Sequence, residues 1–394
     1  MEEDREDDRN EVLNLLSRIE GSFDRVKQRL ADRFDRDDPI QILPYRGFGT
    51  PELLRIQGRV LQDEPIRPAS QQDRALRNLG NIWKRLESDE VPGMAVRAAF
   101  GDWTGETVTD EEGYFRFEIR PREPLAGAGR SWHEVRFEAR DPRTGAPIEA
   151  TGSALVPPPG VSFGIISDVD DTIVETGVTN RLAMARTVLL RNAYTRLPFE
   201  GVAAFYQALH QGRDGDDRNP VFFVSGSPWN LYDLLAEFMR LQGIPEGPIL
   251  LRDFGLSGRN LLRAETREYK LGCIRPIFDL YPELDFILIG DSGEQDPEIY
   301  RQVVREYPGR VRAIYIRNVG AGPARQAEVA ALTREVWGEG IAMLLVKDTE
   351  AASVHAAENG WIRKEKLPEV REEKRKDQEA PSPAEAALSS PRSP

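Results

Sequence analysis

The spacing of apolar residues changes along the chain and divides it into segments with different predicted folds. In residues 11–36, apolar side chains recur every three or four positions, which is the period of an amphipathic helix. Residues 50–156 instead contain the runs MAVRAAF, GYFRFEIR and HEVRFEA, in which apolar and polar positions alternate as in half-buried strands. Turn residues such as Gly113 separate these runs, so a small antiparallel β-sandwich is predicted here.

The predicted N-terminal helix has two interpretations. Arginine and lysine residues lie between its apolar positions, as in helices that bind a membrane surface. Four aspartates, Asp24, Asp32, Asp35 and Asp37, dilute this basic face. A helix docked on the rest of the protein, or paired in a coiled coil, is therefore the alternative interpretation.

Beyond the stiff break PPPG at residues 157–160, the pattern changes to short and nearly continuous apolar runs. VSFGIIS, NPVFFVS, LDFILIG, VRAIYIR and IAMLLV are separated by helical segments, which is typical of a doubly wound parallel sheet. From about Lys364 the chain is rich in Glu, Lys, Pro, Ser and Ala, and this tail is predicted to be disordered.

We therefore expect four parts. Residues 1–44 hold the helix and a linker, 45–156 the β domain, 161–362 the α/β domain and 363–394 the tail. The β domain contains no recognisable catalytic residues, so it is predicted to be a supporting or binding module.

Composition and charge exclude several classes of protein. The formal net charge is 53 − 66 = −13, which argues against a general nucleic-acid binder. The only cysteine is Cys273, so no disulfide can form within this sequence, and no HExxH or paired-Cys spacing supports a zinc site. The start MEEDREDDRN is unlike a signal peptide, and no apolar run reaches the length of a bilayer. A cytoplasmic protein without a transmembrane segment is predicted.

Polar side chains follow several of the predicted strands at their carboxyl ends. Asp168 and Asp170 follow GIIS, Ser225 follows VFFV, and Asp291 follows ILIG. Because ligands of open α/β sheets bind at this edge, we expect these side chains to converge. An all-oxygen set of ligands suits Mg²⁺, which also binds phosphate oxygens. The pattern therefore favours phosphoryl chemistry, with one aspartate as nucleophile and a second carboxylate as general acid and base.

The same residues resemble a known family. DVDDT at residues 168–172 resembles the DxDxT signature of the haloacid dehalogenase superfamily of phosphatases, and Ser225, Lys270 and GDSGEQD match its other motifs in order. SDVDDTIVETGV, FFVSGSPWNLY and FILIGDSGEQDPEIY are similar to the actin-patch-protein type of phosphatidate phosphatase, which is related to the lipins. YRGFGTPELLRIQGRVL and TVTDEEGYFRF resemble the β-rich part of its bacterial members.

The resemblance implies a fold class. It is a doubly wound, haloacid-dehalogenase-like α/β domain without a large cap, preceded by a small antiparallel β domain and an N-terminal helix. No insertion of cap size separates Thr172 from Ser225, or Ser225 from Asp291. Such a site would admit a head group presented at a membrane surface.

The resemblance also implies a nucleophile and a set of metal ligands. Asp168 would be the nucleophile and Asp170 the general acid and base. Mg²⁺ would be held by the side chain of Asp168, the backbone carbonyl of Asp170 and the side chain of Asp291. Asp296 would support the metal, either directly or through water.

Three further residues have implied roles around the phosphoryl group. Thr172 would orient the loop, Ser225 would donate to a phosphoryl oxygen, and Lys270 would offset charge, although Lys270 could also be an ordinary surface lysine. Residues 227–229 could face the substrate or cap the core. Arg252 could bind an anion or form a structural ion pair.

Three functions remain open. The first is a Mg²⁺-dependent phosphatase that acts through an aspartyl-phosphate, with phosphatidate as first candidate substrate and diacylglycerol as product. The second is the same chemistry on a soluble or protein-borne phosphate ester. The third, a non-catalytic phospholipid sensor, ranks last because Asp168 and Asp170 are both present. The expected partner is a lipid phosphate at a membrane surface, with no nucleic acid.

Overall fold

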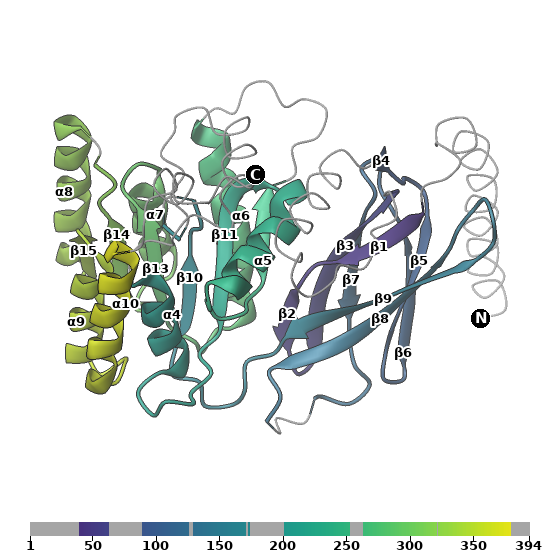
Figure 1. Cartoon of the computed structure of the whole chain (residues 1–394), viewed down its shortest axis with the longest axis horizontal. Helices are drawn as coiled ribbons and strands as arrows, with labels where there is room; N and C mark the ends of the chain where they lie inside the picture. The colour runs from purple at the N-terminus through teal and green to yellow at the C-terminus, as the bar shows by residue number, and fades with distance from the viewer. Residues whose placement is uncertain are drawn as a thin grey trace, which may run out of the picture.

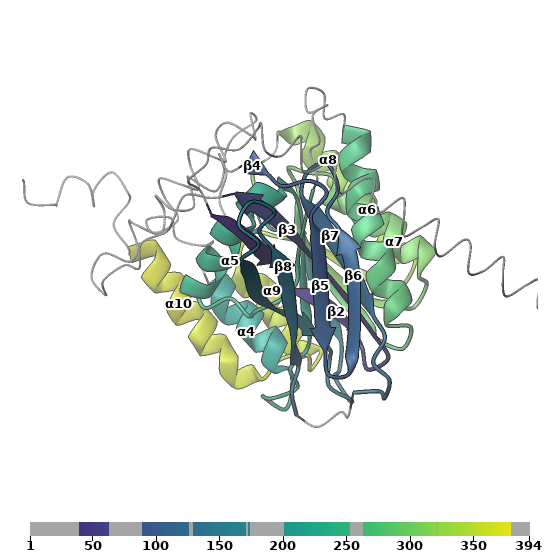
Figure 2. The same cartoon turned by 90° about the vertical axis from the view of Figure 1, so that its right-hand side faces the viewer.

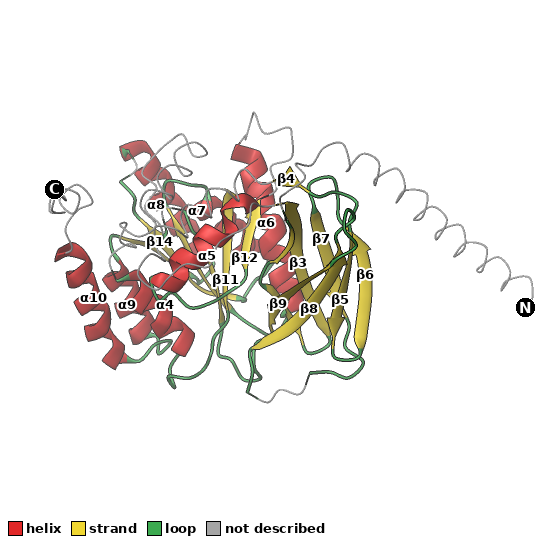
Figure 3. Cartoon of the chain, turned by 45° about the vertical axis from the view of Figure 1, so that its right-hand side comes forward, coloured by secondary structure: helices red, strands yellow, loops and turns green. Residues whose placement is uncertain are grey.

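The computed structural model describes residues 39–62, 89–125, 129–170, 172–173, 201–252, 263–320 and 322–379. The chain forms two β-sheets that lie next to each other, one in each half of the molecule (Figure 1). Figure 3 shows strands and loops in one half, and helices on both sides of the strands in the other. The predicted helix at residues 11–36 lies outside the described residues, as does most of the stretch between Thr172 and Ser225 in which a cap was judged absent.

Among the described residues, the first sheet contains nine strands, β1–β9. They are β1 Ile40–Pro44, β2 Gly47–Thr50, β3 Leu53–Gln62, β4 Asp89–Glu90, β5 Ala95–Phe100, β6 Trp103–Val108, β7 Tyr114–Ile119, β8 Trp132–Arg140 and β9 Pro147–Leu155. The sheet order is β1-β3-β2-β9-β8-β5-β6, with β4 and β7 also paired to β3. The alternating residues predicted to face one side are buried here, and the rings of Phe115, Phe117 and Phe137 lie with centroids 5.3–6.0 Å apart.

The predicted fold class is wrong in its description of this half. The first sheet is mixed rather than antiparallel, because β2 pairs with β9 in parallel through Gly47 with Ala154 and Phe48 with Leu155. It is also not a small domain, since its nine strands take up residues 40–155. The structure is a mixed sheet followed by a separate parallel sheet with helices, not a haloacid-dehalogenase-like domain with a small antiparallel appendage. Alternation along a strand reports which side chains are buried, but not the direction of the neighbouring strand.

The part of the second sheet that the structure describes has six strands, all parallel, in the order β12-β11-β10-β13-β14-β15. They are β10 Gly164–Ser167, β11 Val221–Pro228, β12 Ile249–Arg252, β13 Phe286–Asp291, β14 Val311–Arg317 and β15 Ala342–Val346. The five apolar runs singled out in the sequence form β10, β11, β13, β14 and β15. Most side chains of β10, β11, β13 and β14 are buried, as the continuous runs predict, whereas the edge strand β15 is only partly buried.

Helices cover both faces of the second sheet. They are α4 Val202–Gln211, α5 Tyr232–Leu241, α6 Arg263–Leu280, α7 Asp296–Glu306, α8 Pro323–Gly338 and α9 Thr349–Glu358. Buried residues of α4, α5 and α9 form one core cluster with the sheet, and those of α6, α7 and α8 form another. Figure 2 shows the two groups on opposite sides of the strands. None of the described helices is long and apolar enough to span a bilayer.

Part of the tail predicted to be disordered is helical. Residues Lys364–Lys366 form the 3₁₀ turn η2, and Leu367–Glu379 form α10, which packs on α4 and α9. Glu373 Oε2 accepts a hydrogen bond of 2.6 Å from Ala204 N in the first turn of α4, and Lys374 Nζ lies 2.7 Å from Asp348 Oδ2. Val370 is fully buried. The charged composition of this segment therefore gave no sign that a buried valine and specific polar contacts hold it against α4 and α9.

The two halves are in direct contact. Phe48 of β2 packs edge-on against Phe222 of β11, with ring centroids 5.6 Å apart. Tyr281, just after α6, donates from its hydroxyl to Gly49 O at 2.9 Å. Because Phe48 and Leu155 are part of the core beneath the second sheet, the two sheets share one apolar interior at this boundary.

Two glycines of the α/β half should respond oppositely to alanine. At Gly164, in the central strand β10, an added Cβ would overlap the ring of the fully buried Phe286. We expect Gly164→Ala to lower the free energy of unfolding by about 1–3 kcal/mol through overpacking. Gly272 lies on an exposed position of α6 with open space around it, so Gly272→Ala should raise this free energy by up to about 1 kcal/mol through helix propensity. Urea unfolding of both variants measures the difference, and equal effects would contradict this packing.

Candidate active site

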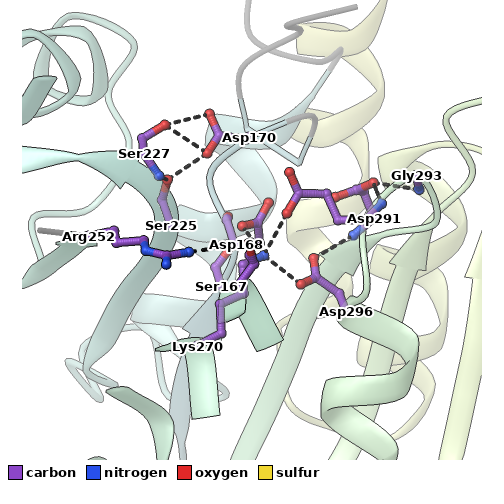
Figure 4. A network of polar contacts seen from close by, with 12 residues as sticks. Ser167, Asp168, Asp170, Ser225, Ser227, Arg252, Lys270, Asp291, Gly293 and Asp296 are labelled. Atoms are coloured by element: carbon purple, nitrogen blue, oxygen red, sulfur yellow. Dashed lines mark hydrogen bonds and ion pairs between the residues drawn. The ribbon is translucent and has the colours of Figure 1, made fainter. Parts of the chain in front are cut away.

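The predicted site residues meet at the carboxyl edge of the second sheet (Figure 4). Asp168 follows the central strand β10, which lies between β11 and β13. Asp168 N donates to Ile289 O at 2.9 Å, which fixes the start of the loop against β13. Ser225 belongs to β11 and Asp291 ends β13. The neighbouring strands therefore bring these three side chains to one place, as expected from the parallel topology.

A buried lysine lies between three carboxylates. Lys270 Nζ, from α6, lies 2.7 Å from Asp168 Oδ1, 2.6 Å from Asp296 Oδ1 and 3.1 Å from Glu294 Oε2. Its side chain is 2% exposed, so the alternative of an ordinary surface lysine is wrong. Burial alone would lower the pKa of Lys270, but Asp168, Asp296 and Glu294 together hold this pKa well above its usual range. Lys270 therefore stays a cation within the site.

Three of the aspartates form a group suited to a cation. One carboxylate oxygen from each of Asp168, Asp291 and Asp296 lies within 4.8 Å of the others. Asp168 Oδ2 and Asp291 Oδ2 are buried and accept no hydrogen bond from the part of the chain that the structure describes. Leaving a buried carboxylate oxygen unpaired is costly, and a hard cation with oxygen ligands would satisfy both atoms. This group of residues fits a divalent cation such as Mg²⁺.

The raised pKa values of the aspartates also indicate a site for a cation. Burial raises the pKa of Asp168 well above its usual range although Lys270 opposes the shift. Burial, together with Asp296 and Glu294, raises the pKa of Asp291 to about 8. The pKa of Asp296 is likewise raised, with burial the largest cause. A bound cation would favour the ionised carboxylates and so reverse these shifts.

Asp170 has a different environment from the cation group. Its Oδ2 accepts hydrogen bonds from Ser225 Oγ at 2.6 Å and from Ser227 Oγ at 3.0 Å, and Ser227 N donates to Ser225 Oγ at 2.9 Å. Burial and the nearby Glu294 raise the pKa of Asp170, although both serine hydroxyls oppose the shift. In this structure Ser225 therefore holds the Asp170 carboxyl, while its predicted partner was a phosphoryl oxygen.

The loop after β13 is shaped around Asp291. Its Oδ1 accepts from Gly293 N at 2.6 Å and from Glu294 N at 2.9 Å, while Asp291 N donates to Asp296 Oδ2 at 3.2 Å. A side chain at Gly290 would place its Cβ 2.5 Å from Asp296 Oδ2, so glycine allows Asp296 to approach the strand. GDSGEQD thus forms a turn in which the carboxylates of Glu294 and Asp296 contact Lys270.

Sequence reasoning missed two residues of this region. Glu294 contacts Lys270, and its position inside GDSGEQD was the available signal. Arg325, at the start of α8, donates from Nε to Ser292 O at 2.9 Å and from Nη2 to Glu294 O at 2.5 Å, and it also pairs with Glu298. No motif connects Arg325 to the loop, because the two meet only through packing of α8 against α7.

The remaining predicted residues have mixed outcomes. Thr172 is buried, and its hydroxyl makes no hydrogen bond to described residues, so the implied loop-orienting bond is not seen among them. Arg252, at the end of β12, lies at the same edge as Ser225 in Figure 4, and its Nη1 is 3.5 Å from Thr266 Oγ1. Of residues 227–229, Ser227 faces Asp170 whereas Trp229 is part of the core.

Fold and site together define an α/β protein with a buried carboxylate–lysine site at the carboxyl edge of a parallel sheet. Residues 163–318, which contain this site, match the family model described as phosphatidate phosphatase APP1, catalytic domain. The resemblance predicted from the motifs, to phosphatidate phosphatases of this type, is confirmed for this segment.

Two curated relatives match the same region. The chain is 36% identical to phosphatidate phosphatase APP1 of Saccharomyces cerevisiae over 173 residues, which are 43% of this chain and 28% of that protein. It is 34% identical to an uncharacterized protein of Schizosaccharomyces pombe over 162 residues, 40% of this chain and 25% of the relative. The chain thus spans between 25% and 28% of the length of these relatives.

Solved structures resemble the chain only weakly. The PilB minor pilin from Streptococcus sanguinis has 9% identity and a TM-score of 0.25, covering 76% of this chain and 90% of the pilin. A carbohydrate acetylesterase from Xanthomonas citri has 11% identity and a TM-score of 0.26, covering 76% and 66%. Likeness at this level carries no argument about fold or function.

The raised pKa of Asp291 links folding to pH when no divalent cation is bound. A carboxyl with an ordinary pKa of 3.8 and a folded-state pKa of about 8 contributes stability that is fully present below the lower value. That stability is lost as the pH rises toward the higher value. We expect Asp291→Asn to lose less stability than the unsubstituted chain between about pH 5 and about pH 8.

Urea unfolding in the presence of a chelator, at several pH values for both proteins, measures this difference. Asp279→Asn, at an exposed position of α6, is the matched control and should keep the original pH dependence. If the free energy of unfolding changed with pH in the same way for Asp291→Asn and for the unsubstituted chain, the pKa of Asp291 would not be raised in the folded state.

Proposed function

We propose that the chain is a phosphatase of phosphate monoesters whose substrate is phosphatidate, with diacylglycerol and phosphate as products. The observation that carries the proposal is the set of contacts made by the two carboxylate oxygens of Asp168. One of its carboxylate oxygens contacts the Lys270 ammonium at 2.7 Å, and the other is buried and unpaired among the described residues. A carboxylate held in this way, beside a fixed positive charge and with one oxygen open to a cation, can act as a nucleophile through its other oxygen. The choice of phosphatidate is supported by the match of residues 163–318 to the family model.

Mg²⁺ is the proposed cofactor. The side chains of Asp168 and Asp291 would be ligands, because each has a buried oxygen without a partner among the described residues, and the backbone carbonyl of Asp170 would be a third. Both oxygens of Asp296 already accept hydrogen bonds, from Lys270 Nζ and Asp291 N, which supports an indirect role through water. When bound, the ion supplies positive charge that stabilises the negative charge of the phosphoryl group.

The reaction has two steps. In the first, an oxygen of Asp168 attacks phosphorus, the bond to the leaving alkoxide breaks, and an aspartyl-phosphate forms. Asp170 gives its proton to the alkoxide, a role that its raised pKa supports. In the second step Asp170 takes a proton from water, which attacks phosphorus and releases phosphate and the Asp168 carboxylate. Lys270 offsets charge on Asp168 and on the phosphoryl group throughout.

A lipid substrate requires action at a membrane surface. We propose that the chain binds there peripherally, because no described helix can span a bilayer. The predicted amphipathic helix at residues 11–36 is a candidate for this contact, and it lies outside the described residues. Cytoplasmic location stays a prediction.

Phosphate release from phosphatidate in mixed micelles tests the proposal. With Mg²⁺ the unsubstituted chain should release phosphate, and a chelator should abolish release. Asp168→Asn removes the nucleophile and Asp170→Asn removes the proton donor, so each should lower kcat by about 10²-fold or more. Asp279→Asn exchanges an exposed aspartate of α6 outside the site and should leave the rate unchanged.

A small aryl phosphate serves as second substrate and separates the alternatives. Hydrolysis of the aryl phosphate without hydrolysis of phosphatidate would keep the chemistry and overturn the lipid assignment in favour of a soluble or protein-borne ester. Inactivity on both, combined with binding to phosphatidate vesicles, would overturn catalysis and favour the phospholipid sensor.

A further inference from the structure

The residues that hold Asp170 lie in a part of β11 that the sheet does not support. We call residues 225–227 the serine segment. Pairing of β11 with β10 covers residues 221–223 only. Pairing with β12 stops at Val224, with Leu250, and resumes only at Pro228, with Arg252, after an irregularity. In the described pairing of strands, neither serine pairs with a neighbouring strand. The direction of the two serine side chains therefore depends on what holds the chain beyond Pro228.

The chain beyond Pro228 is held by the first half of the molecule. The 3₁₀ turn η1, Trp229–Leu231, begins with a tryptophan whose ring stacks on Tyr45 of the first half, with centroids 4.4 Å apart and planes at 15°. Tyr45 also contacts Tyr232, with centroids 4.5 Å apart, and Arg46 N donates to the hydroxyl of Tyr232 at 2.8 Å. Tyr45 is 4% exposed and Trp229 is 7% exposed, so this stack is part of the interior.

A second contact comes from an arginine of β3. Arg59 donates from Nη1 to Asn230 Oδ1 in η1 at 2.8 Å. Its other donors bind the first half, with Nε to Glu112 O at 2.7 Å and Nη2 to Glu90 Oε1 at 2.9 Å, and its guanidinium lies 4.6 Å from the ring centre of Tyr114. The arginine is 5% exposed and fixed on three sides, so it is a rigid donor for Asn230.

We propose that Tyr45 and Arg59 are positioning residues for Ser225 and Ser227, and that the first sheet completes the active site through η1. Figure 1 shows β2 and β3 beside α5, which continues directly from η1. The serine segment is anchored at one end by the β11 ladder and at the other by Trp229 and Asn230. Shifts of about 1 Å in groups that orient a reacting carboxyl cost about 10²-fold in rate, so both anchors matter for catalysis. The inference rests on the proposed phosphatase function.

Exchanges at Tyr45 test the stacked contact. Tyr45→Leu removes the ring from Trp229 and should lower kcat/KM for a small aryl phosphate with Mg²⁺ by about 10-fold to 100-fold. Tyr45→Phe keeps the ring and should retain the original kcat/KM. Tyr281→Phe is the matched control, because it removes the hydrogen bond to Gly49 O between the two halves away from the serine segment. It should leave kcat/KM unchanged.

Exchanges at Asn230 test the second contact without risk to the core, because Asn230 is exposed. Asn230→Ala removes the acceptor for Arg59 and should lower kcat/KM with little change in the urea unfolding midpoint. Asn230→Asp keeps an acceptor oxygen and should restore kcat/KM. This rescue distinguishes positioning from a general loss of stability.

Each outcome decides a separate point. Suppose that the unsubstituted chain is active and that Tyr45→Leu and Asn230→Ala change only the unfolding midpoint. This result would overturn the inference and leave the phosphatase proposal intact. If Tyr281→Phe loses as much activity as Tyr45→Leu, any weakening between the halves suffices and the specific anchor is overturned. An unsubstituted chain that hydrolyses no phosphate ester would overturn the proposed function, and the inference with it.

Discussion

The Lys270 ammonium is the charge on which the carboxylate site depends. Asp168, Glu294 and Asp296 lie within 3.1 Å of it, and Asp291 lies beside Asp296. In a buried site, these acids raise one another's pKa, and without a cation the fold would have to take up protons to hold them. One lysine pairs with three of them, and an oxygen of Asp168 and one of Asp291 have no partner among the described residues. The network is therefore incomplete at the place that we assign to Mg²⁺.

The second sheet supplies the geometry that this charge network needs. Because β10 lies between β11 and β13, Asp168 is placed between Ser225 and Asp291 although the three are far apart in sequence. All strands run in the same direction, so their carboxyl ends share one edge. The missing side chain at Gly290 then lets Asp296 approach close enough to accept from Asp291 N.

The first half of the molecule contacts the turn next to the same site. It packs on the second sheet through Phe48 and contacts η1 through Tyr45 and Arg59. Only residues 163–318 match the family model, so these contacts join the matched segment to a β half outside the match. A rigid neighbour of this kind can limit the motion of a segment that its own sheet does not support.

Much of the α/β half was predictable from local pattern. Runs of apolar residues identified five of its six strands, and motifs at their ends identified Asp168, Asp170, Ser225 and Asp291, because strand length and side-chain alternation are local properties. The mixed pairing of β2 with β9 was not predictable, since half-buried strands carry no mark of their partner's direction. The packing of α10 was hidden in the same way, because one buried Val370 is too little apolar signal in a charged segment.

The sequence by itself determined which residues could perform phosphoryl chemistry and at which strand ends they lie. Only the tertiary structure decided which of them touch. It joined Lys270 to Glu294, turned Ser225 toward Asp170, and brought Arg325 to the carbonyls of the β13 loop. Those contacts join residues 24 to 55 positions apart, and their geometry depends on how whole helices and sheets pack, which no local pattern records.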